Sequence, residues 1–251
     1  MYLGNFINKL NKKYKKIYFS ELAFNSAKVK KDNIFFAIRG TNSDGNNYIN
    51  DAIKKGAKIV ISDKKIKHKY KNIICIQVNN PRKLLAEISY KLLTKKPKKI
   101  IAVTGTNGKS SVADFYYQLL NLNKKRTASI GTIGIQANNK KNLVENTTLD
   151  PINLRKILNN LCKNKINNII LEASSHGLKQ NRLDGLLFDI GIFTNLSHDH
   201  LDYHKNINDY FNAKLYLFKN LIKKKGIVIT DTTIPQFKKI EKLANNKKLK
   251  L

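Results

Sequence analysis

The residues from Gly105 to Ser110 (GTNGKS) have the composition of a phosphate-binding loop. Glycines let backbone N–H groups point at phosphate oxygens, and a helix starting there adds the positive end of its dipole. Lys109 would then reach the outer phosphates, and the Ser110 hydroxyl would bind Mg²⁺. The full pattern G-x-x-x-x-G-K-[ST] needs glycine at position 103, where this chain has Val103. The shorter form alone is also compatible with a glycine turn and a chance lysine.

Two further side chains have types suited to holding a metal ion. Glu172 ends an apolar run, where a carboxylate can face a ligand crevice and share a hard cation with Ser110. His200 lies in the polar run DHLD. The alternatives are a capping or surface glutamate and a packed or solvated histidine. From residue type alone, these alternatives stay open.

Strands and helices alternate around the loop. The apolar run Ile100–Thr104 predicts a strand before it, and Ser111–Leu122 predicts a helix after it, the order that a phosphate loop requires. Such alternation favours a parallel sheet covered on both faces. The other elements expected here are strands at Asn168–Ala173, Asp189–Thr194 and Gly226–Thr230, helices near Ile152–Lys163 and Ile207–Leu221, and a helical tail at Lys238–Leu251 with no strand after it.

The N-terminal part alternates in the same way. Strands are expected at Asn33–Ile38, Lys58–Ser62 and Ile73–Val78, with helices at Tyr48–Lys55 and from Pro81 to about Leu93. The polar run Thr94–Lys99 contains a proline and suits a linker. We therefore predict an α/β chain of two domains, residues 1–97 and 98–251.

The chain is strongly basic. Its 251 residues include 48 Lys plus Arg against 17 Asp plus Glu, a formal net charge of +31. One interpretation is a nucleic-acid-binding protein. The other is compositional drift, which we favour because lysines occur in nearly every segment rather than in one tail. In either case the positive field would attract acidic small molecules such as nucleotides.

Other classes are excluded by composition. A hydrophobic fraction of 41% argues against a disordered chain. Cys75 and Cys162 lie far apart without a CxxC pattern, so neither a disulfide scaffold nor a zinc site is expected. No apolar run approaches the roughly 18–20 residues of a membrane span, and residues 1–16 lack a signal-peptide core. We expect a cytoplasmic protein with no membrane partner.

Several motifs together resemble one family. GTNGKSS at Gly105–Ser111 resembles the ATP loop of the Mur ligases, the ATP-dependent amide-forming enzymes of peptidoglycan synthesis. SSHGL and DHLDYH resemble the members that add the third residue of the stem peptide, and they argue against folate-polyglutamate synthesis. The motifs that follow in family order are NTT at 146–148, EASSHGL at 172–178, QNR at 180–182 and FTNLSHDHLDYH at 193–204; upstream, NSAKVKKDNIFFAIRG at 25–40 and DGNNYI at 44–49 resemble its uridine-nucleotide-binding start.

The resemblance implies the chemistry. ATP phosphorylates a carboxylate of UDP-N-acetylmuramoyl-L-alanyl-D-glutamate, and the amine of a diamino acid then attacks the acyl phosphate. The diamino acid would be meso-diaminopimelate, which we favour, or L-lysine. The first domain would bind the UDP-linked substrate, and the second would be a parallel-sheet P-loop ATPase domain. ATP and Mg²⁺ are therefore expected, and no nucleic acid.

The resemblance also assigns residues. Lys109, Lys214 and His200 would be catalytic, with Lys214 carbamylated by CO₂. Nearby Tyr210 and Phe211 would help desolvate that amine and lower its pKa. The remaining assignments are ATP binding by Gly105, Thr106, Asn107, Gly108, Lys109, Ser110 and Ser111; metal binding by Ser110, Glu172, His200 and carbamylated Lys214; muramoyl-dipeptide binding by Asn146, Thr147, Thr148, Ser174, Gln180 and Arg182; and uridine diphosphate binding by Phe24, Ser26, Thr41, Asn42 and Ser43.

The chain also departs from the family pattern. Ala27 and His198 stand where the family usually has arginine. The resemblance ends at about residue 235, inside the central ATPase domain, and the family's C-terminal domain with its site for the incoming amino acid is expected to be absent. We therefore expect either a partner domain encoded separately or an inactive remnant that binds ATP and the UDP-linked substrate.

The ligase interpretation makes one geometric prediction. Strands ending at Thr104, Ala173 and Thr194 should lie side by side, so that the loops after them open on one edge of the sheet. Ser110 and Glu172 should then face one cation while His200 and Lys214 approach a second. The alternative predicts a surface lysine, a capping glutamate and a stray histidine that point in different directions.

Overall fold

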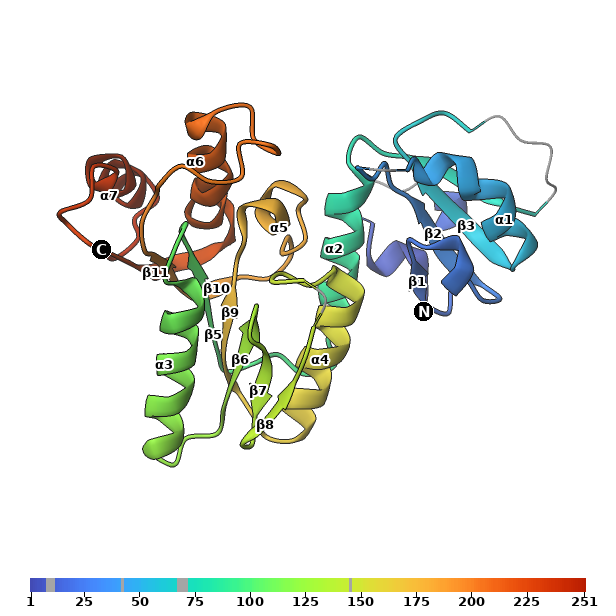
Figure 1. The fold of residues 1–251 in the computed structure, drawn as a ribbon. Coiled ribbons are helices and arrows are strands. Elements are labelled where there is room, and N and C mark those ends of the chain that lie inside the picture. The colour runs from blue at the N-terminus through green and yellow to red at the C-terminus, as the bar shows by residue number, and fades with distance from the viewer. Residues whose placement is uncertain (8–11, 42, 67–71, 145) are drawn as a thin grey trace. The chain divides into compact units, whose positions relative to one another are not determined.

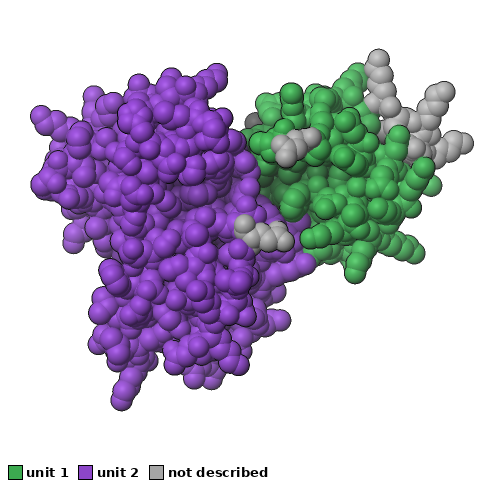
Figure 2. Space-filling model, in the orientation of Figure 1, with its two compact units in different colours: residues 1–92 green, residues 93–251 purple. Residues whose placement is uncertain are grey.

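The apolar segments form two separate sheets in the computed structural model, which describes residues 1–7, 12–41, 43–66, 72–144 and 146–251. The chain divides into two units, residues 1–92 and residues 93–251 (Figure 2). The linker composition placed the boundary between residues 97 and 98, so the structure puts it slightly earlier.

The first unit has a parallel sheet. Over its described residues the strands in spatial order are β1 (Leu22–Ala23), β2 (Asn33–Ala37), β3 (Ala57–Ser62) and β4 (Ile74–Gln77). The helical segments are η1 (Leu3–Asn5), η2 (Lys12–Tyr14), η3 (Ser26–Lys28), η4 (Gly45–Tyr48), α1 (Ile49–Lys54) and α2 (Pro81–Lys91). Every residue of β2 is buried, which is why its residues after Asn33 form a continuous apolar run rather than an alternating one.

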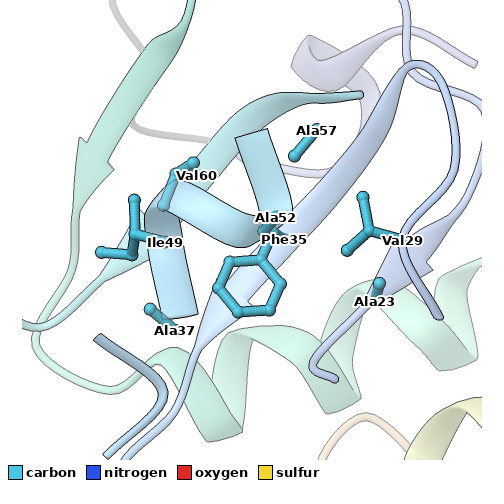
Figure 3. Close-up of a cluster of buried hydrophobic side chains, with 8 residues drawn as sticks. All are labelled: Ala23, Val29, Phe35, Ala37, Ile49, Ala52, Ala57 and Val60. Atoms are coloured by element: carbon cyan, nitrogen blue, oxygen red, sulfur yellow. The ribbon is translucent and has the colours of Figure 1, made fainter. Parts of the chain in front are cut away.

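A cluster of apolar side chains holds α1 against the first sheet (Figure 3). Phe35 of β2 contacts a group that includes Ile49 and Ala52 of α1 and Val60 of β3. The packing holds β2 and α1 together, and a connection that includes η4 joins them. That connection contains Thr41 and Ser43, two of the residues expected to bind uridine diphosphate.

The second unit has the larger sheet (Figure 1). It is parallel from β11 to β6 and antiparallel from β6 to β8. Over the described residues its strands in spatial order are β11 (Ile222–Thr230), β10 (Phe188–Phe193), β5 (Lys99–Thr104), β9 (Asn168–Glu172), β6 (Thr127–Gly131), β7 (Gly134–Ala137) and β8 (Lys140–Asn142). The helical segments are α3 (Lys109–Leu122), α4 (Pro151–Lys163), α5 (Ser175–Lys179), α6 (Ile207–Tyr216), the π-helical turn η5 (Leu217–Leu221) and α7 (Phe237–Asn246).

Strand β5 lies inside the larger sheet, between β10 and β9. Its Ile101 and Val103 pack with Ala113 of α3 and Ile170 of β9 in a buried cluster. This position explains the unbroken apolar run before the glycine turn, because both faces and both edges of β5 are covered. The predicted α/β fold class with a parallel sheet is confirmed.

The end of the chain differs from the expectation. The predicted helix Lys238–Leu251 is wrong beyond Asn246, where α7 ends. Lys250 instead pairs in parallel with Ile227 at the edge of β11. The amide of Val228 donates to the Lys250 carbonyl at 2.7 Å. Backbone groups at a sheet edge are open to such pairing, and side-chain periodicity does not report it.

Cys75 and Cys162 are both free thiols, and burial raises the pKa of each, that of Cys75 to about 11. They therefore remain in the protonated, weakly reactive form near neutral pH. Within the described ranges, no helix has both the length and the apolar character needed to cross a membrane.

Candidate nucleotide and acceptor site

Three strand ends meet at one edge of the larger sheet, as predicted. The Thr194 amide donates to the Thr104 carbonyl at 3.0 Å, and the Ala173 amide donates to the Val103 carbonyl at 2.8 Å. The chain therefore leaves β10, β5 and β9 side by side. In a parallel sheet this arrangement opens the following loops toward a common crevice.

The glycine loop after β5 is held by the segment that leaves β10. The Thr106 amide donates to the Asn195 carbonyl, and the Asn107 amide donates to Asn195 Oδ1, both at 2.9 Å. Thr194 Oγ1 donates to the Asn107 carbonyl at 2.6 Å. Gly105 has φ +149°, and a Cβ there would lie 1.8 Å from Thr194 Oγ1. The loop needs glycine at this position because its support approaches so closely.

The N-terminus of α3 faces the crevice. Gly108 is its N-cap residue with φ 78°, and among the described residues no side chain caps the first turn. Unsatisfied N–H groups and the positive end of the helix dipole make such a terminus a binding site for anions. Lys109 is the first residue of α3, and its Nζ donates to the carbonyls of Gly105 (3.1 Å) and Thr106 (2.7 Å).

A pocket of about 330 Å³ lies over this helix terminus. Its wall includes Ser110, Glu172, His200 and Lys214, so the structure brings together the four residues predicted to converge. The other lining residues are Thr106, Asn107, Gly108, Lys109, Ser111, Thr132, Thr147, Ser174, Ser175 and Tyr210. The alternative of a surface lysine does not hold, because Lys214 is buried.

Lys214 of α6 is almost fully buried, with 1% of its surface exposed. Its Nζ donates to the Gly105 carbonyl at 2.6 Å and lies 4.1 Å from the ring centre of Tyr210. Burial and, to a smaller extent, the positive charge of Lys109 lower the pKa of Lys214 to about 7, against the opposing effect of Asp199. A substantial fraction of this amine is therefore neutral at neutral pH.

Lys109 and Lys214 share the Gly105 carbonyl as acceptor. Burial also lowers the pKa of Lys109, whereas the charges of Glu172 and Asp199 raise it. Two ammonium groups on one oxygen repel each other. The pocket is thus arranged to favour loss of a proton from one of them, or the arrival of negative charge.

Glu172, at the end of β9, is the buried carboxylate of the pocket, with 2% of its surface exposed. Its Oε1 accepts from the Thr132 amide at 2.9 Å, and its Oε2 accepts from Thr132 Oγ1 at 3.3 Å. Thr132 was not expected from the sequence to take part in this site. Its only signal is a position between Gly131 and Gly134, in a hairpin that was not predicted.

The donor set can be compared with what a metal ion needs. Among the described residues, no three His, Cys, Asp or Glu side chains form a cluster that could hold a metal. Mg²⁺ retains several waters and binds one or two carboxylates together with substrate phosphates, rather than an all-protein cage. The Glu172 carboxylate and the Ser110 hydroxyl beside an anion-binding helix terminus fit that requirement.

His200 lies at the more open side of the pocket, with 45% of its side chain exposed. Its Nε2 is 3.6 Å from Asp199 Oδ2, and its ring lies 4.9 Å from that of His176. His176 in turn stacks on Tyr203 with ring centres 4.0 Å apart. His176 and Tyr203 belong to the motifs SSHGL and DHLDYH, but the sequence did not indicate that they would stack beside His200.

Four of the six residues expected to bind the muramoyl dipeptide are joined by hydrogen bonds: Thr148, Ser174, Gln180 and Arg182. The Ser174 amide donates to Thr148 Oγ1 at 2.9 Å, and Arg182 Nη1 donates to the Thr148 carbonyl at 2.5 Å. Gln180 Oε1 accepts from Arg182 Nη2 at 2.8 Å. Thr147 and Ser174 reach the pocket wall, whereas Thr148, Gln180 and Arg182 support that wall and Asn146 is exposed beyond it.

The uridine-binding candidates belong to the first unit. Phe24 is exposed over 40% of its surface, and Thr41 and Ser43 are also exposed. Ser26 is buried and hydrogen-bonds to Asp51, which lowers the pKa of that carboxyl. Asn42 lies outside the described residues. Only the exposed members of this group are free to approach a ligand without rearrangement.

Two family descriptions match the chain. Mur ligase middle domain matches residues 103–251, and Mur ligase family, catalytic domain, matches residues 19–91. The first match contains the whole pocket described above. The second covers the parallel sheet of the first unit.

Curated relatives agree with these matches. The UDP-N-acetylmuramoyl-L-alanyl-D-glutamate--2,6-diaminopimelate ligase of Rickettsia conorii is 42% identical over 236 residues, which cover 91% of this chain and 48% of the relative. The ligase of the same name from Clostridium tetani is 37% identical over 205 residues, covering 80% and 42%. The chain spans about half the length of the curated relatives it matches.

Solved structures give the same result. A structure of a UDP-N-acetylmuramoyl-L-alanyl-D-glutamate--2,6-diaminopimelate ligase has a TM-score of 0.82 at 30% identity, covering 95% of this chain and 48% of that one. A MurF ligase from Thermotoga maritima in complex with ADP shares the fold, with a TM-score of 0.56 at 21% identity over 89% of this chain and 48% of that one. The Mur ligase middle domain matches more than half of this chain, and the Rickettsia conorii relative is 42% identical over 91% of it. The chain therefore belongs to the Mur ligase family.

Proposed function

We propose that the chain acts in ATP-dependent amide bond formation in peptidoglycan synthesis, on UDP-N-acetylmuramoyl-L-alanyl-D-glutamate and with meso-diaminopimelate as the added amino acid. The observation that carries the proposal is the single pocket that joins Lys109, Glu172, His200 and Lys214 at the N-terminus of α3. The names of the relatives support the choice of substrates. ATP would phosphorylate the substrate carboxylate, and the amine would displace phosphate to form the amide.

The nucleotide half of this chemistry belongs to the glycine loop. Lys109 would exchange its contacts with two loop carbonyls for phosphate oxygens, and residues Gly105–Ser111 would surround the phosphates. Charge-assisted hydrogen bonds of this kind are stronger than those to a neutral carbonyl, so the exchange is favourable. The first turn of α3 would supply further N–H donors.

Magnesium would neutralise phosphate charge when it is bound and so lower the barrier to phosphoryl transfer. Glu172 and Ser110 would hold one ion together with the phosphates. His200 and carbamylated Lys214 would hold a second. The buried Glu172 carboxylate is already oriented by two donors from Thr132, so little reorganisation is needed.

Lys214 has the features that carbamylation requires. Its neutral amine would attack CO₂, forming a C–N bond and releasing one proton to give a carbamate anion. The pKa of about 7 supplies the neutral amine. The carbamate nitrogen keeps one N–H, which can still donate to the Gly105 carbonyl. The repulsion between Lys214 and Lys109 would then become an attraction.

The acceptor half would use the neighbouring network. Thr147 and Ser174 would contact the muramoyl dipeptide from the pocket wall, and Arg182 would bind carboxylate or phosphate oxygens. Asn146, Thr148 and Gln180 would complete this group. In the first unit, we assign the uridine diphosphate to Phe24, Ser26, Thr41, Asn42 and Ser43.

One experiment tests the proposal in two stages. The full chain is titrated with ATP–Mg²⁺ and with UDP-N-acetylmuramoyl-L-alanyl-D-glutamate by calorimetry, and is then incubated with both and with meso-diaminopimelate. Mass spectrometry detects the tripeptide product, and a coupled assay detects ADP. Product formation supports the ligase. If neither ligand binds, the proposal fails.

A second candidate is a binding form that makes no bond. It rests on the same pocket, whose glycine loop and acceptor wall would serve binding alone. The same experiment separates the two functions. Binding of both ligands without product or ADP, under conditions where a full-length relative is active, would support the binding form.

A further inference from the structure

One residue supplies a hydrogen-bond donor to each oxygen of the Glu172 carboxylate. The Thr132 amide donates to Oε1 at 2.9 Å and the Thr132 hydroxyl to Oε2 at 3.3 Å. Each oxygen thus has one donor, which fixes both the position of the carboxylate and the rotation of its plane. A carboxylate oxygen can accept more than one hydrogen bond, so lone pairs remain for a cation.

The backbone beside Thr132 is shaped to receive this carboxylate. Gly131 ends β6, next to β9 in the sheet (Figure 1). A Cβ at Gly131 would lie 2.1 Å from Glu172 Oε1 and 2.5 Å from Cδ. Thr132 then begins the tight turn into β7, because Gly131 and Gly134 form the last pair of the hairpin. The turn and the glycine together hold the carboxylate.

The same hydroxyl reaches the acceptor segment, residues 146–148, which is proposed to contact the muramoyl dipeptide. Thr132 Oγ1 and Thr147 Oγ1 are 2.9 Å apart, and both residues line the pocket. The next residue returns to the same glutamate, since Thr148 Oγ1 lies 2.9 Å from the Glu172 carbonyl oxygen. Glu172 is therefore bonded to the acceptor segment through its side chain by way of Thr132, and through its backbone by way of Thr148.

We propose that Thr132 is a positioning residue that orients Glu172 for a divalent cation and links that cation site to the acceptor segment at Thr147. The inference rests on the proposed function, because it assumes that Glu172 meets magnesium and that Thr147 meets the acceptor. Outer partners of metal ligands commonly change metal affinity about 10- to 100-fold when they are lost. The Thr132 hydroxyl is such an outer partner of Glu172.

The test compares Thr132→Val, which removes only the hydroxyl, with Thr132→Ser, which keeps it. Thr94→Val is the matched control, because the Thr94 hydroxyl also makes a hydrogen bond, to Asn159, but does not line the pocket. Binding of a non-hydrolysable ATP analogue to the full chain is measured by calorimetry with and without Mg²⁺. Melting temperatures without ligand check that each variant folds.

The magnesium enhancement is the ratio of the affinity for the analogue with Mg²⁺ to the affinity without it. We expect this ratio to be about tenfold smaller in the valine variant, with unchanged affinity for the metal-free analogue. The serine and Thr94→Val variants should keep the wild-type enhancement. A full enhancement in Thr132→Val overturns the inference while the proposed function stands. If the wild-type chain does not bind the analogue at all, the proposed function fails and the inference falls with it.

The link to the acceptor has its own measurement. The affinity for UDP-N-acetylmuramoyl-L-alanyl-D-glutamate is measured with and without the analogue and Mg²⁺, and the ratio reports the coupling between the two sites. In Thr132→Val and in Thr147→Val this ratio should move toward one. In Thr132→Ser, which keeps the hydroxyl, it should equal the wild-type ratio. A wild-type ratio in both valine variants refutes the link.

Discussion

At the scale of single residues, the pocket concentrates positive charge on one carbonyl oxygen. Lys109 and Lys214 both donate to Gly105, and burial lowers the pKa of each. A core built only for stability would not place two ammonium groups there. The arrangement becomes favourable when one amine loses its proton or when anions arrive, and nucleotide phosphates and a carbamate would supply such anions.

Lys109→Ala should weaken ATP binding without unfolding the chain. The Lys109 side chain contacts carbonyls of a loop that also has support from Thr194 and Asn195, so its removal costs little packing. Loss of one charge-assisted contact should weaken nucleotide binding by about 10- to 100-fold. Calorimetry measures this loss, with Lys98→Ala as an exposed control. Wild-type affinity in Lys109→Ala would rule out the phosphate loop.

Lys214 should form a carbamate when ¹³CO₂ is supplied. Only the neutral amine reacts, so with a pKa of about 7 the signal should grow as the pH rises through 7 and fade below it. Carbon-13 NMR detects the carbamate carbon. Lys214→Arg should lose the signal because guanidinium stays protonated, and Lys219→Arg, at an exposed position of η5, should keep it. A signal that survives in Lys214→Arg belongs to another amine.

The sequence indicated the site residues that follow predicted strands better than those whose place depends on contacts between distant segments. Lys109 and Glu172 follow apolar runs that predict strands, so their place at a sheet edge followed from local pattern. Thr132 could not be found that way, because its role depends on β6 lying beside β9. The stacking of His176 on Tyr203 has the same origin, since their segments are distant in the chain and meet only when α5 and α6 pack.

At the scale of elements, Asp44 closes the start of η4. Its Oδ1 accepts from the Asn46 amide at 2.9 Å, and its Oδ2 lies 2.8 Å from Lys64 Nζ. These contacts, with that of Lys64 the largest, lower the pKa of the Asp44 carboxyl from 3.8 to about 2. The folded chain therefore binds this proton less tightly than the unfolded chain. The stabilisation is complete above pH 3.8 and is lost as the pH falls toward 2.

Asp44→Asn should accordingly lower the free energy of unfolding of the first unit at neutral pH by about 1 kcal/mol, a value reduced for the solvent exposure of the pair. The amide keeps the cap acceptor but removes the charge. Asp44→Ala should cost about 1 kcal/mol more, since it also removes the cap. Urea unfolding followed by NMR signals of α1 measures both. The Asp44→Asn difference should vanish near pH 2; a constant difference would place its origin in packing.

Helices and buried strands followed their expected positions more closely than turns and edges. The helix expected near Ile152–Lys163 is observed as α4 (Pro151–Lys163), because the N-cap acceptor Asp150 and the proline at its first position act locally. The strands β6–β8 were missed because β6 (Thr127–Gly131) has Ile130 as its one large apolar side chain, and β8 (Lys140–Asn142) consists of exposed residues. The predicted helix Ile207–Leu221 changes to a π-helical turn at Leu217, which residue spacing does not report.

At the scale of the whole molecule, most of the positive charge lies outside the pocket. The net charge of +31 arises from basic residues throughout the sequence. The pocket itself contains two lysines and the acid Glu172. Long-range attraction of an anionic ligand therefore comes mainly from the surface, whereas its retention depends on a few local contacts. These two contributions respond differently to salt, because screening weakens exposed and distant charges more than buried ones.

We therefore expect salt to slow the association of ATP more than it speeds its dissociation. Raising the ionic strength from about 0.01 M to about 0.15 M shortens the Debye length from about 30 Å to about 8 Å, and the association rate constant should fall by about tenfold. Stopped-flow measurements with a fluorescent ATP analogue give both rate constants. Adenosine, which carries no phosphate charge, is the control and should show no such dependence. If the dissociation rate carries the whole salt effect, the surface charge has no part in nucleotide capture, and the contacts of Lys109 and the α3 terminus alone account for binding.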